Sequence, residues 1–256
     1  MNATELFDIK GKKAIVTGGT RGLGRGMAEA LLEAGCETVI IGSSDGVFTA
    51  AEEFAKKGLN CKAVKADLGK REEIYSAFSE AVSMLGGDLD ILVTAHGIQR
   101  RYSAEVFPIE EWDEVINVNL HSVFILCKEA GIIMLKKGYG KIITVSSMSA
   151  WFGGQTVPAY TAAKGGVAQL TKELSNDWFS RGINVNSIAP GYMATDMTAA
   201  LQDKSKPRYQ QILDRIPAGR WGTPDDMKGA TIFLASHASD YLGGCILPVD
   251  GGYLVK

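Results

Sequence analysis

The stretch KKAIVTGGTRGLG, residues 12–24, joins a short apolar run to a glycine-rich turn. Residues 12–17 are predicted to form a buried strand, and apolar residues at helical spacing over 22–34 predict a helix directly after it. Glycines between a strand and a helix let the backbone turn tightly and approach a pyrophosphate, whose charge the helix N-terminus attracts. The spacing is G-x-x-x-G-x-G rather than G-x-G-x-x-G, so the turn alone is a weak indication of a nucleotide site.

The alternation of strand and helix patterns continues along the whole chain. Further strands are predicted at 38–41, 61–66, 90–94, 141–146, 183–189 and 245–249, and further helices at 47–57, 70–85, 110–137 and 158–180. These strands are mostly apolar with little alternation, which is typical of parallel strands covered on both faces. We therefore expect residues 1–256 to form a single α/β domain, a Rossmann-type doubly wound parallel sheet of about seven strands with helices on both faces. The one long irregular stretch, 192–224, is predicted to be an inserted substrate loop.

Composition narrows the possible classes of function. The 256 residues are 46% hydrophobic, and 27 basic against 29 acidic residues give a formal charge of −2. No surplus of positive charge exists to drive nucleic-acid binding. The N-terminus has no apolar signal core, and no apolar run approaches the ~18 residues of a membrane span. The four cysteines form no C-x-x-C pair, so we expect free thiols, no metal site and a cytoplasmic protein.

Tyr160 and Lys164 are the first candidates for chemistry, because residues at i and i+4 share one helix face. A phenol has a reference pKa near 10 and is a poor base at neutral pH. An ammonium ~4 Å away at an effective dielectric of ~20 is worth at most ~4 kcal/mol, or about 3 pKa units. We therefore expect Lys164 to lower the pKa of Tyr160 towards 7, where the phenol can donate or accept a proton.

Other polar residues are predicted to meet this pair at one edge of the sheet. Ser146, Ser147 and Ser149 follow the fifth strand, Asn119 lies in the long helix after the fourth, and Pro190-Gly191 closes the sixth. In a doubly wound sheet, ligands bind at the carboxyl ends of the strands. Any one Ser or Asn is more often a helix cap or a turn residue, but their joint placement at the edge of the glycine loop favours a site.

These residues together resemble the short-chain dehydrogenase/reductase family over essentially the whole chain. The resemblance implies that the T-G-x-x-x-G-x-G motif binds NAD or NADP and that Asn119, Ser147, Tyr160 and Lys164 form a catalytic tetrad. Ser147 is preferred over Ser146 because the serine of the family usually lies 13 residues before the tyrosine. The resemblance further implies that Tyr160 exchanges a proton with the substrate oxygen, Ser147 bonds that oxygen, Lys164 binds the nicotinamide ribose, and Asn119 holds a water.

The family pattern also implies the residues that hold the cofactor, Asp67 being the adenine contact. The expected set is Gly18, Thr20, Arg21, Gly22, Leu23, Gly24, Ser43, Asp67, Leu68, Gly97, Tyr160, Lys164, Pro190, Gly191 and Thr195. Members of the family are often homotetramers built through two long helices, here 110–137 and 158–180, so a homotetramer is expected.

One segment departs from the family pattern. The N-N-A-G that usually follows the fourth strand is here Thr94-Ala95-His96-Gly97. The missing asparagines usually tie the sheet together, which puts the local rigidity of this segment in question. His96 is expected either to pack within the loop or to reach the cofactor.

A narrower resemblance is visible in the segments IQRR (98–101), VPAY (157–160), PGYMAT (190–195) and RIPAGRWG (215–222). They are similar to dehydrogenases of sugar acids within the family, namely the 2-dehydro-3-deoxy-D-gluconate 5-dehydrogenases (2-deoxy-D-gluconate 3-dehydrogenases) and the related gluconate 5-dehydrogenases. The resemblance implies hydride transfer between NAD(P) and a secondary alcohol or ketone of a sugar acid. A reductase of another polyol or ketone, and a nucleotide-binding protein without activity, are the alternatives.

A sugar acid carries a carboxylate, which an arginine can pair through two parallel hydrogen bonds. Arg100, Arg101 and Arg208 are the candidate cations. The expected substrate contacts are Arg101, Ser147, Tyr160, Tyr192 and Arg208.

The choice between NAD and NADP stays open at this point. An acidic residue after the second strand usually binds the ribose 2′-hydroxyl of NAD. That place holds Gly42-Ser43-Ser44, with Asp45 slightly late, whereas Arg21 in the glycine loop could meet a 2′-phosphate. These residues favour NADP, while the narrower resemblance favours NAD.

Overall fold

Seven parallel strands form one sheet in the order β3-β2-β1-β4-β5-β6-β7 in a computed structural model that describes all of residues 1–256. The strands are β1 (Lys13–Thr17), β2 (Glu37–Gly42), β3 (Cys61–Lys65), β4 (Ile91–Thr94), β5 (Gly140–Val145), β6 (Ile183–Pro190) and β7 (Ile246–Val249). The helices are α1 (Gly22–Glu33), α2 (Gly46–Lys56), α3 (Arg71–Met84), α4 (Ile109–Ile116), α5 (Ser122–Lys137), α6 (Pro158–Trp178), α7 (Pro207–Leu213) and α8 (Lys228–Ala235). The predicted doubly wound parallel sheet is confirmed.

The direction in which strands are added reverses beside β1, since β2 pairs with one side of it and β4 with the other. A reversal of this kind leaves a crevice at the carboxyl ends of the strands, because the connections on its two sides run away from each other. Both the glycine turn after β1 and the altered segment after β4 open into that crevice. The topology therefore places the two most unusual stretches of the sequence side by side.

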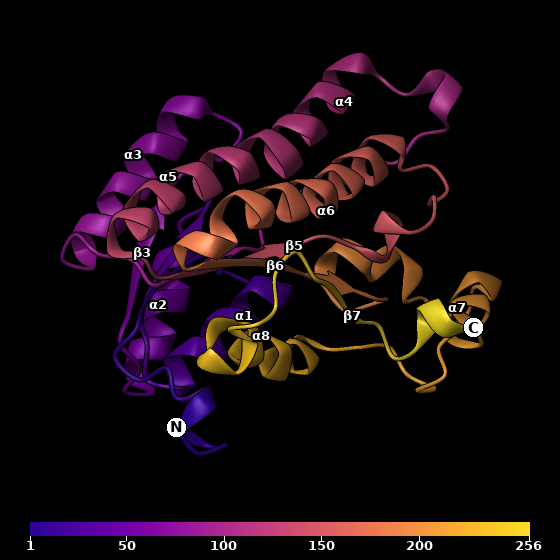
Figure 1. Cartoon of the computed structure of the whole chain (residues 1–256). Coiled ribbons are helices and arrows are strands. Elements are labelled where there is room, and N and C mark those ends of the chain that lie inside the picture. Colours follow the sequence, from indigo (N-terminus) through magenta and orange to yellow (C-terminus); the bar gives the residue numbers. More distant parts are fainter.

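Helices cover both faces of the sheet, and Figure 1 shows α3, α5 and α6 on one face with α1, α2 and α8 on the other. Two separate apolar cores result, because alternate residues of each strand point to opposite faces. In β1, Ile15 belongs to the core under α3, α5 and α6, whereas Val16 belongs to the core under α1, α2 and α8. This burial on both faces explains why the strands are apolar without alternation.

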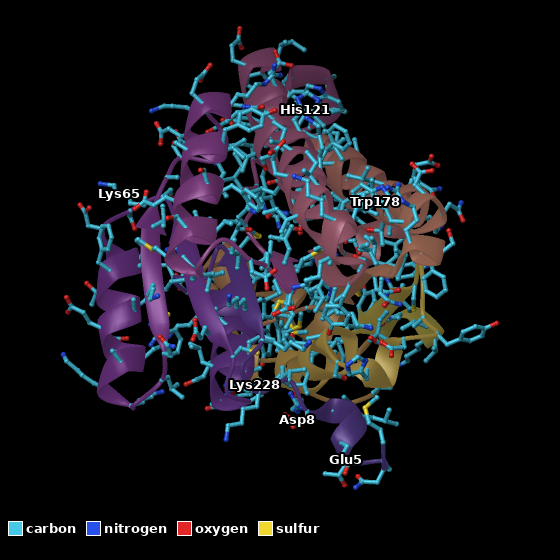
Figure 2. The ribbon with its side chains drawn as sticks, turned by 60° about the vertical axis from the view of Figure 1, so that its left-hand side comes forward. Glu5, Asp8, Lys65, His121, Trp178 and Lys228 are labelled. Carbon is cyan, nitrogen blue, oxygen red and sulfur yellow. The ribbon has the colours of Figure 1, made fainter.

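Close packing of α5 against α6 depends on a glycine. A Cβ atom at Gly131 of α5 would lie 2.7 Å from the ring of Trp178 at the end of α6. Figure 2 labels Trp178 on the outer part of the ribbon, where α6 ends. The absence of a side chain at Gly131 therefore lets the indole ring lie directly on the backbone of α5.

The long helix predicted over 110–137 is interrupted. Residues Asn117–His121 form a π-helical turn between α4 and α5, with Asn119 at its centre. The sequence pattern did not show this turn, because one wider turn changes the helical periodicity too little to detect in a mostly apolar segment. π turns inside α-helices are frequent at functional sites.

The segment 192–224 is more regular than predicted, and α7 lies where residues 208–216 have helical spacing. This segment contains a 3-10 helix at Asp196–Leu201 and the helix α7, and α8 follows it, although α8 was not predicted. A third apolar cluster joins the segment to the C-terminal residues, through Met148, Ile212, Ile216, Trp221 and Tyr253. The segment is ordered by this small core of its own, whose members are too far apart in sequence to form a visible pattern.

The run Ile109–Lys137 is long and apolar enough, by length and composition alone, to cross a membrane, contrary to the expectation from the sequence. Half of its most apolar window is buried in the fold. A core helix that packs against a sheet passes the same test, so this run is weak evidence for a span.

Candidate active site

The glycine turn after β1 is packed against the segment that follows β4. Gly18 has φ +71°, and a Cβ atom there would lie 2.8 Å from the Cα of His96. A Cβ atom at Gly24 would overlap the carbonyl oxygen of Gly18. Glycine is required at both positions, at Gly18 because L side chains rarely adopt a positive φ and at Gly24 because no space exists.

The start of α1 offers donors suited to a phosphate. Its first turn holds no acidic residue, and Arg21 at the N-cap makes no side-chain capping bond. The first N–H groups of a helix have no partner within it and carry the positive end of the dipole. The Oγ1 atom of Thr20, directly before this turn, is buried without a hydrogen-bond partner. The free N–H groups fit the diphosphate of a dinucleotide, while the unsatisfied hydroxyl of Thr20 lies against Gly42 at the end of β2.

Four of the expected cofactor residues lie at the start of α1 or at and just after the end of β6. Thr195 lies over the glycine loop, since its Cγ2 is 3.6 Å from where a Cβ of Gly22 would be. Gly191, after Pro190 at the end of β6, touches Asp250 closely enough that a Cβ would lie 2.6 Å from the Asp250 Cα. Leu23 is half-buried at the start of α1.

The expected adenosine contacts lie further out. Asp67, after β3, is exposed and accepts a hydrogen bond from the N–H of Gly69 at 2.9 Å, and Leu68 beside it is buried. Ser43, after β2, is exposed. Asp45 pairs with Lys65 at 2.8 Å, so its carboxylate already has a cationic partner.

Asn119 and Lys164 converge on Gly97. A Cβ atom at Gly97 would lie 3.1 Å from the Oδ1 of Asn119 and 3.8 Å from the Nζ of Lys164. Both ends of the Asn119 amide bond the backbone of Ile98, with Oδ1 accepting from its N–H and Nδ2 donating to its C=O, each at 2.8 Å. Lys164 donates to the carbonyl of Val145 at 2.7 Å. One donor and one acceptor site of the asparagine amide are thus used within the protein, while Lys164 keeps two N–H donors.

The two adjacent serines have different surroundings. Ser146 is buried between β5 and β6, where its Oγ is 2.9 Å from the Oγ of Ser187. Ser147 caps the next short helix, its Oγ accepting from the N–H of Ser149 at 3.2 Å, and its side chain lowers the pKa of Tyr160. The structure therefore brings Ser147, and not Ser146, to Tyr160.

The electrostatics of Tyr160 differ from the expectation. Burial raises the pKa of Tyr160, although a hydrogen bond from Ser147 and the charge of Arg101 lower it in part. Burial also lowers the pKa of Lys164 to about 8. In the protein alone the lysine therefore loses its proton before the phenol ionises, and it does not bring the pKa of Tyr160 near 7. The predicted shift was wrong because both groups lose hydration together.

The three candidate arginines lie in different surroundings. Arg100 is paired with Glu111 at 3.5 Å and with Glu114 at 2.8 Å. Arg101 makes no ion pair, and its charge acts on Tyr160. Arg208 lies exposed on α7, where its charge acts on Tyr253. Arg101 and Arg208 both make no ion pair, and Arg101 is the one of the three whose charge lowers the pKa of Tyr160.

Aromatic rings from the 192–224 segment and the C-terminus gather beside the site. The ring of Tyr192 lies 5.4 Å from that of Trp221 and 5.2 Å from that of Tyr253. The guanidinium of Arg215 lies over the Tyr253 ring at 4.2 Å, a second cation that sequence reasoning missed. Its presence in the segment RIPAGRWG was visible, but its stacking on a residue 38 positions away was not.

His96 does not lie in the open crevice. Its Nδ1 is 2.6 Å from the Oγ1 of Thr17 and its Nε2 is 2.6 Å from the Oγ of Ser122. Burial lowers the pKa of His96 to about 3, and the charge of Lys164 adds to this effect. Both ring nitrogens are engaged inside the protein, so the ring is not free to bond a cofactor.

The buried imidazole makes stability depend on pH. Its pKa in the folded chain lies below the ordinary value of 6.5, so its contribution to stability is complete above pH 6.5 and is lost as the pH falls towards 3. Between pH 6.5 and 5.0 the free energy of unfolding of the wild type should fall by about 2 kcal/mol more than that of His96→Phe. Urea unfolding at both pH values measures this difference. Equal losses in the two proteins would contradict it.

The chain matches a known family and is similar to known proteins over nearly its whole length. The family described as enoyl-(acyl carrier protein) reductase matches residues 18–254. The chain is 46% identical over 252 residues to the 2-dehydro-3-deoxy-D-gluconate 5-dehydrogenase of Bacillus subtilis (strain 168), covering 98% of each. It is 44% identical over 251 residues to the protein of the same name from Escherichia coli (strain K12), again covering 98% of each.

A solved structure is similar over the full length of both chains. It is a gluconate 5-dehydrogenase from Burkholderia cenocepacia J2315 in complex with NADP and tartrate, with a TM-score of 0.94, 36% identity and 100% coverage of each chain. Similarity at this level extends across the glycine turn, the crevice and the segment that covers it.

Proposed function

Since this chain belongs to the short-chain dehydrogenase/reductase family, we propose that it is an NAD(P)-dependent dehydrogenase of sugar acids. It interconverts a secondary alcohol and a ketone, and 2-dehydro-3-deoxy-D-gluconate is the substrate class that its relatives of 44–46% identity favour. Gluconate 5-dehydrogenase activity is the second candidate. The similarity to a gluconate 5-dehydrogenase solved with tartrate, a hydroxylated dicarboxylate, supports it.

One observation carries the proposal: Arg101 makes no ion pair, and its charge lowers the pKa of Tyr160, as does a hydrogen bond from Ser147. A phenol with a hydrogen-bonding neighbour suits proton exchange with a carbonyl or alcohol oxygen. A free guanidinium nearby suits a carboxylate on the same small molecule. A simple alcohol or ketone would leave this arginine without a partner.

Each group in the tetrad has a separate task. In reduction the Tyr160 phenol donates its proton to the carbonyl oxygen and becomes a phenolate, and in oxidation the Tyr160 phenolate accepts the proton of the substrate hydroxyl. Ser147 bonds the same oxygen and fixes its position. Lys164 keeps a positive charge beside the phenol and bonds the ribose. When bound, NAD(P) accepts or supplies the hydride.

The cofactor would be held by groups already described. The N–H groups of the first turn of α1 suit its phosphates, while Asp67 and Leu68 suit the adenine. Arg21 pairs with Asp196 at 3.0 Å, and both side chains are more than three-quarters exposed. Because such an exposed pair is worth little, Arg21 can turn to a 2′-phosphate, which supports NADP binding.

A panel of sugar acids and their ketones, assayed with NAD and NADP in parallel by absorbance at the nicotinamide band, tests the proposal. Turnover of a deoxyketogluconate above that of gluconate supports the first candidate, and the reverse supports the second. Activity only on polyols without a carboxylate would overturn both. Cofactor binding without turnover of any alcohol or ketone would indicate an inactive nucleotide-binding protein.

Arg101→Met should raise KM for a sugar acid by about 30-fold, the loss of one charge-assisted hydrogen bond, while kcat changes less. Arg100→Met is the matched control, because Arg100 is already paired with Glu111 and Glu114. Steady-state kinetics of both variants measure the difference. Equal effects at the two positions, or none at Arg101, would remove the proposed carboxylate contact.

We further propose that residues 192–224 form a substrate loop, and that Tyr192 within it contacts the sugar acid. Arg208, also in this segment, is the weaker candidate because its charge acts on Tyr253. Unfolding of the loop core by Trp221→Ala would expose the site to solvent. We propose that residues 1–256 form one domain, with this loop inserted after β6.

The assembly and location follow from the family. We propose a cytoplasmic homotetramer built through α4–α5 and α6. Phe124 and Ile132 on α5 support this interface, since they are 46% and 43% exposed in the single chain. Four free cysteines support a reducing compartment. Sedimentation of the purified protein as a monomer would contradict the assembly.

A further inference from the structure

A chain of side-chain hydrogen bonds runs through His96 and joins the sheet to the π turn. It begins at Thr17, the last residue of β1, and passes through both ring nitrogens to Ser122, each contact being 2.6 Å. Ser122 then donates to the carbonyl of Val118 within the π turn, also at 2.6 Å. These bonds therefore connect the end of β1, under the glycine loop, to the π turn that carries Asn119.

With a neutral imidazole, one arrangement of protons makes all three 2.6 Å contacts of this chain hydrogen bonds. The single hydroxyl proton of Ser122 goes to the Val118 carbonyl, so its oxygen accepts from the Nε2–H of His96. The Nδ1 atom is then an acceptor for the hydroxyl of Thr17. All donors point in the same direction along the chain, an arrangement in which each bond polarises and strengthens the next.

The residues directly after His96 are the ones that Asn119 holds. Its amide makes both bonds to Ile98, and its Oδ1 lies 3.1 Å from where a Cβ of Gly97 would be. The segment 96–98 is thus attached to the π turn at two points, through the His96 side chain and through the backbone of Ile98. Asn119 is fully buried, so its position depends entirely on these contacts.

The π turn is held at both of its ends. At the start, Asn117 donates to the carbonyl of Gly69 at 2.5 Å, and at the end Ser122 is held by His96. Figure 2 labels His121, the last residue of the turn. If the turn reverted to α-helix, the residues on one side would rotate by about 100° and Asn119 would leave Ile98.

We propose that His96 is a positioning residue, which exchanges no proton with the substrate and instead holds the π turn so that Asn119 stays beside Gly97 and Lys164. His96 lies in the segment 94–97, where this chain lacks the asparagines of the family pattern. The effect on turnover rests on the proposed function, in which Asn119 belongs to the tetrad, whereas the effect on the π turn does not.

Amide hydrogen exchange in the cofactor-free protein tests the structural part. His96→Phe and Ser122→Ala should each speed exchange at the amide of Ile98 and over 117–121 by about tenfold or more, since each removes two hydrogen bonds of the chain. Exchange in β6 should not change. Thr231→Val is the matched control, because it removes another buried hydroxyl bond, from Thr231 to Met227 on α8. Unchanged exchange at Ile98 in both variants would overturn the proposal.

Turnover tests the functional part. Each variant should lower kcat about tenfold with KM and the cofactor dissociation constant nearly unchanged, and neither should lower it further in an Asn119→Ala background. Losses that multiply in that background would overturn the proposal, because His96 would then act independently of Asn119. Ser122→Ala keeps the imidazole in place and serves if His96→Phe does not fold. If the wild type turns over no sugar acid, the proposed function fails while the exchange result still decides the role of His96.

Discussion

Tyr160→Phe is expected to lower kcat by about 10³- to 10⁴-fold while the dissociation constant of NAD(P) stays nearly the same. The phenol is the one group with an exchangeable proton that both Ser147 and Arg101 influence. Phenylalanine preserves the ring and its packing but supplies no proton to the substrate oxygen. Stopped-flow absorbance at the nicotinamide band measures the transfer, and cofactor fluorescence measures binding.

A matched control for this variant lies at the other end of the sheet. The hydroxyl of Tyr139 is buried without a hydrogen-bond partner, next to the start of β5. Tyr139→Phe should therefore leave turnover unchanged. Turnover retained by Tyr160→Phe would exclude Tyr160 as the proton donor, whatever the substrate.

Lys164→Met is expected to lower kcat by about 100-fold, because the ammonium no longer positions the nicotinamide ribose through a charge-assisted hydrogen bond worth up to about 3 kcal/mol. The Nζ of Lys164 lies 5.8 Å from the centre of the Tyr160 ring and donates to the carbonyl of Val145. Methionine has a similar length and no charge. Cofactor affinity should also fall, since the proposed ribose bond is lost.

Lys164→Met should also change how the free energy of unfolding depends on pH. The side chain of Lys164 is buried and its pKa is lowered to about 8, below the ordinary 10.5. The cost of burying the charge is therefore complete below pH 8 and disappears as the pH rises towards 10.5. Between pH 8.0 and 9.5 the wild type should gain about 2 kcal/mol of unfolding free energy relative to Lys164→Met.

Denaturant unfolding at the two pH values, at one protein concentration, measures this gain. Parallel pH dependence of the two proteins would mean that Lys164 is not the buried cation that the structure shows. If the wild type gains stability relative to Lys164→Met but the two proteins have the same kcat, Lys164 is a buried cation without the proposed role in turnover.

Strands and helices with a strong local pattern could be predicted from the sequence. The boundaries of β1, α1 and β6 agree with the predicted ranges to within one residue. Runs of buried apolar residues define these strands because the sheet is covered on both faces. The π turn at 117–121 and the helix α8 were missed, because neither has a distinctive local pattern.

The placement of polar groups was predicted less fully than the fold. The convergence of Asn119 and Lys164 follows from strand order, which the alternating pattern implies. The pairing of Arg100 with Glu111 and Glu114 depends on how one loop meets α4, and the aromatic core around Trp221 joins segments far apart in sequence. Contacts of this kind leave no periodic signal.

By itself the sequence determined a doubly wound sheet with a glycine turn at its switch point and a Tyr-x-x-x-Lys pair near the same edge. Local apolar periodicity and the conformational freedom of glycine are properties of short segments, so they are visible without a structure. Only the tertiary structure decided that Lys164 does not lower the pKa of Tyr160, that Arg100 is paired whereas Arg101 is not, and that His96 bonds Thr17 and Ser122. Burial and hydrogen bonding between distant segments set those properties, because the pKa and the partners of a side chain depend on what surrounds it in space.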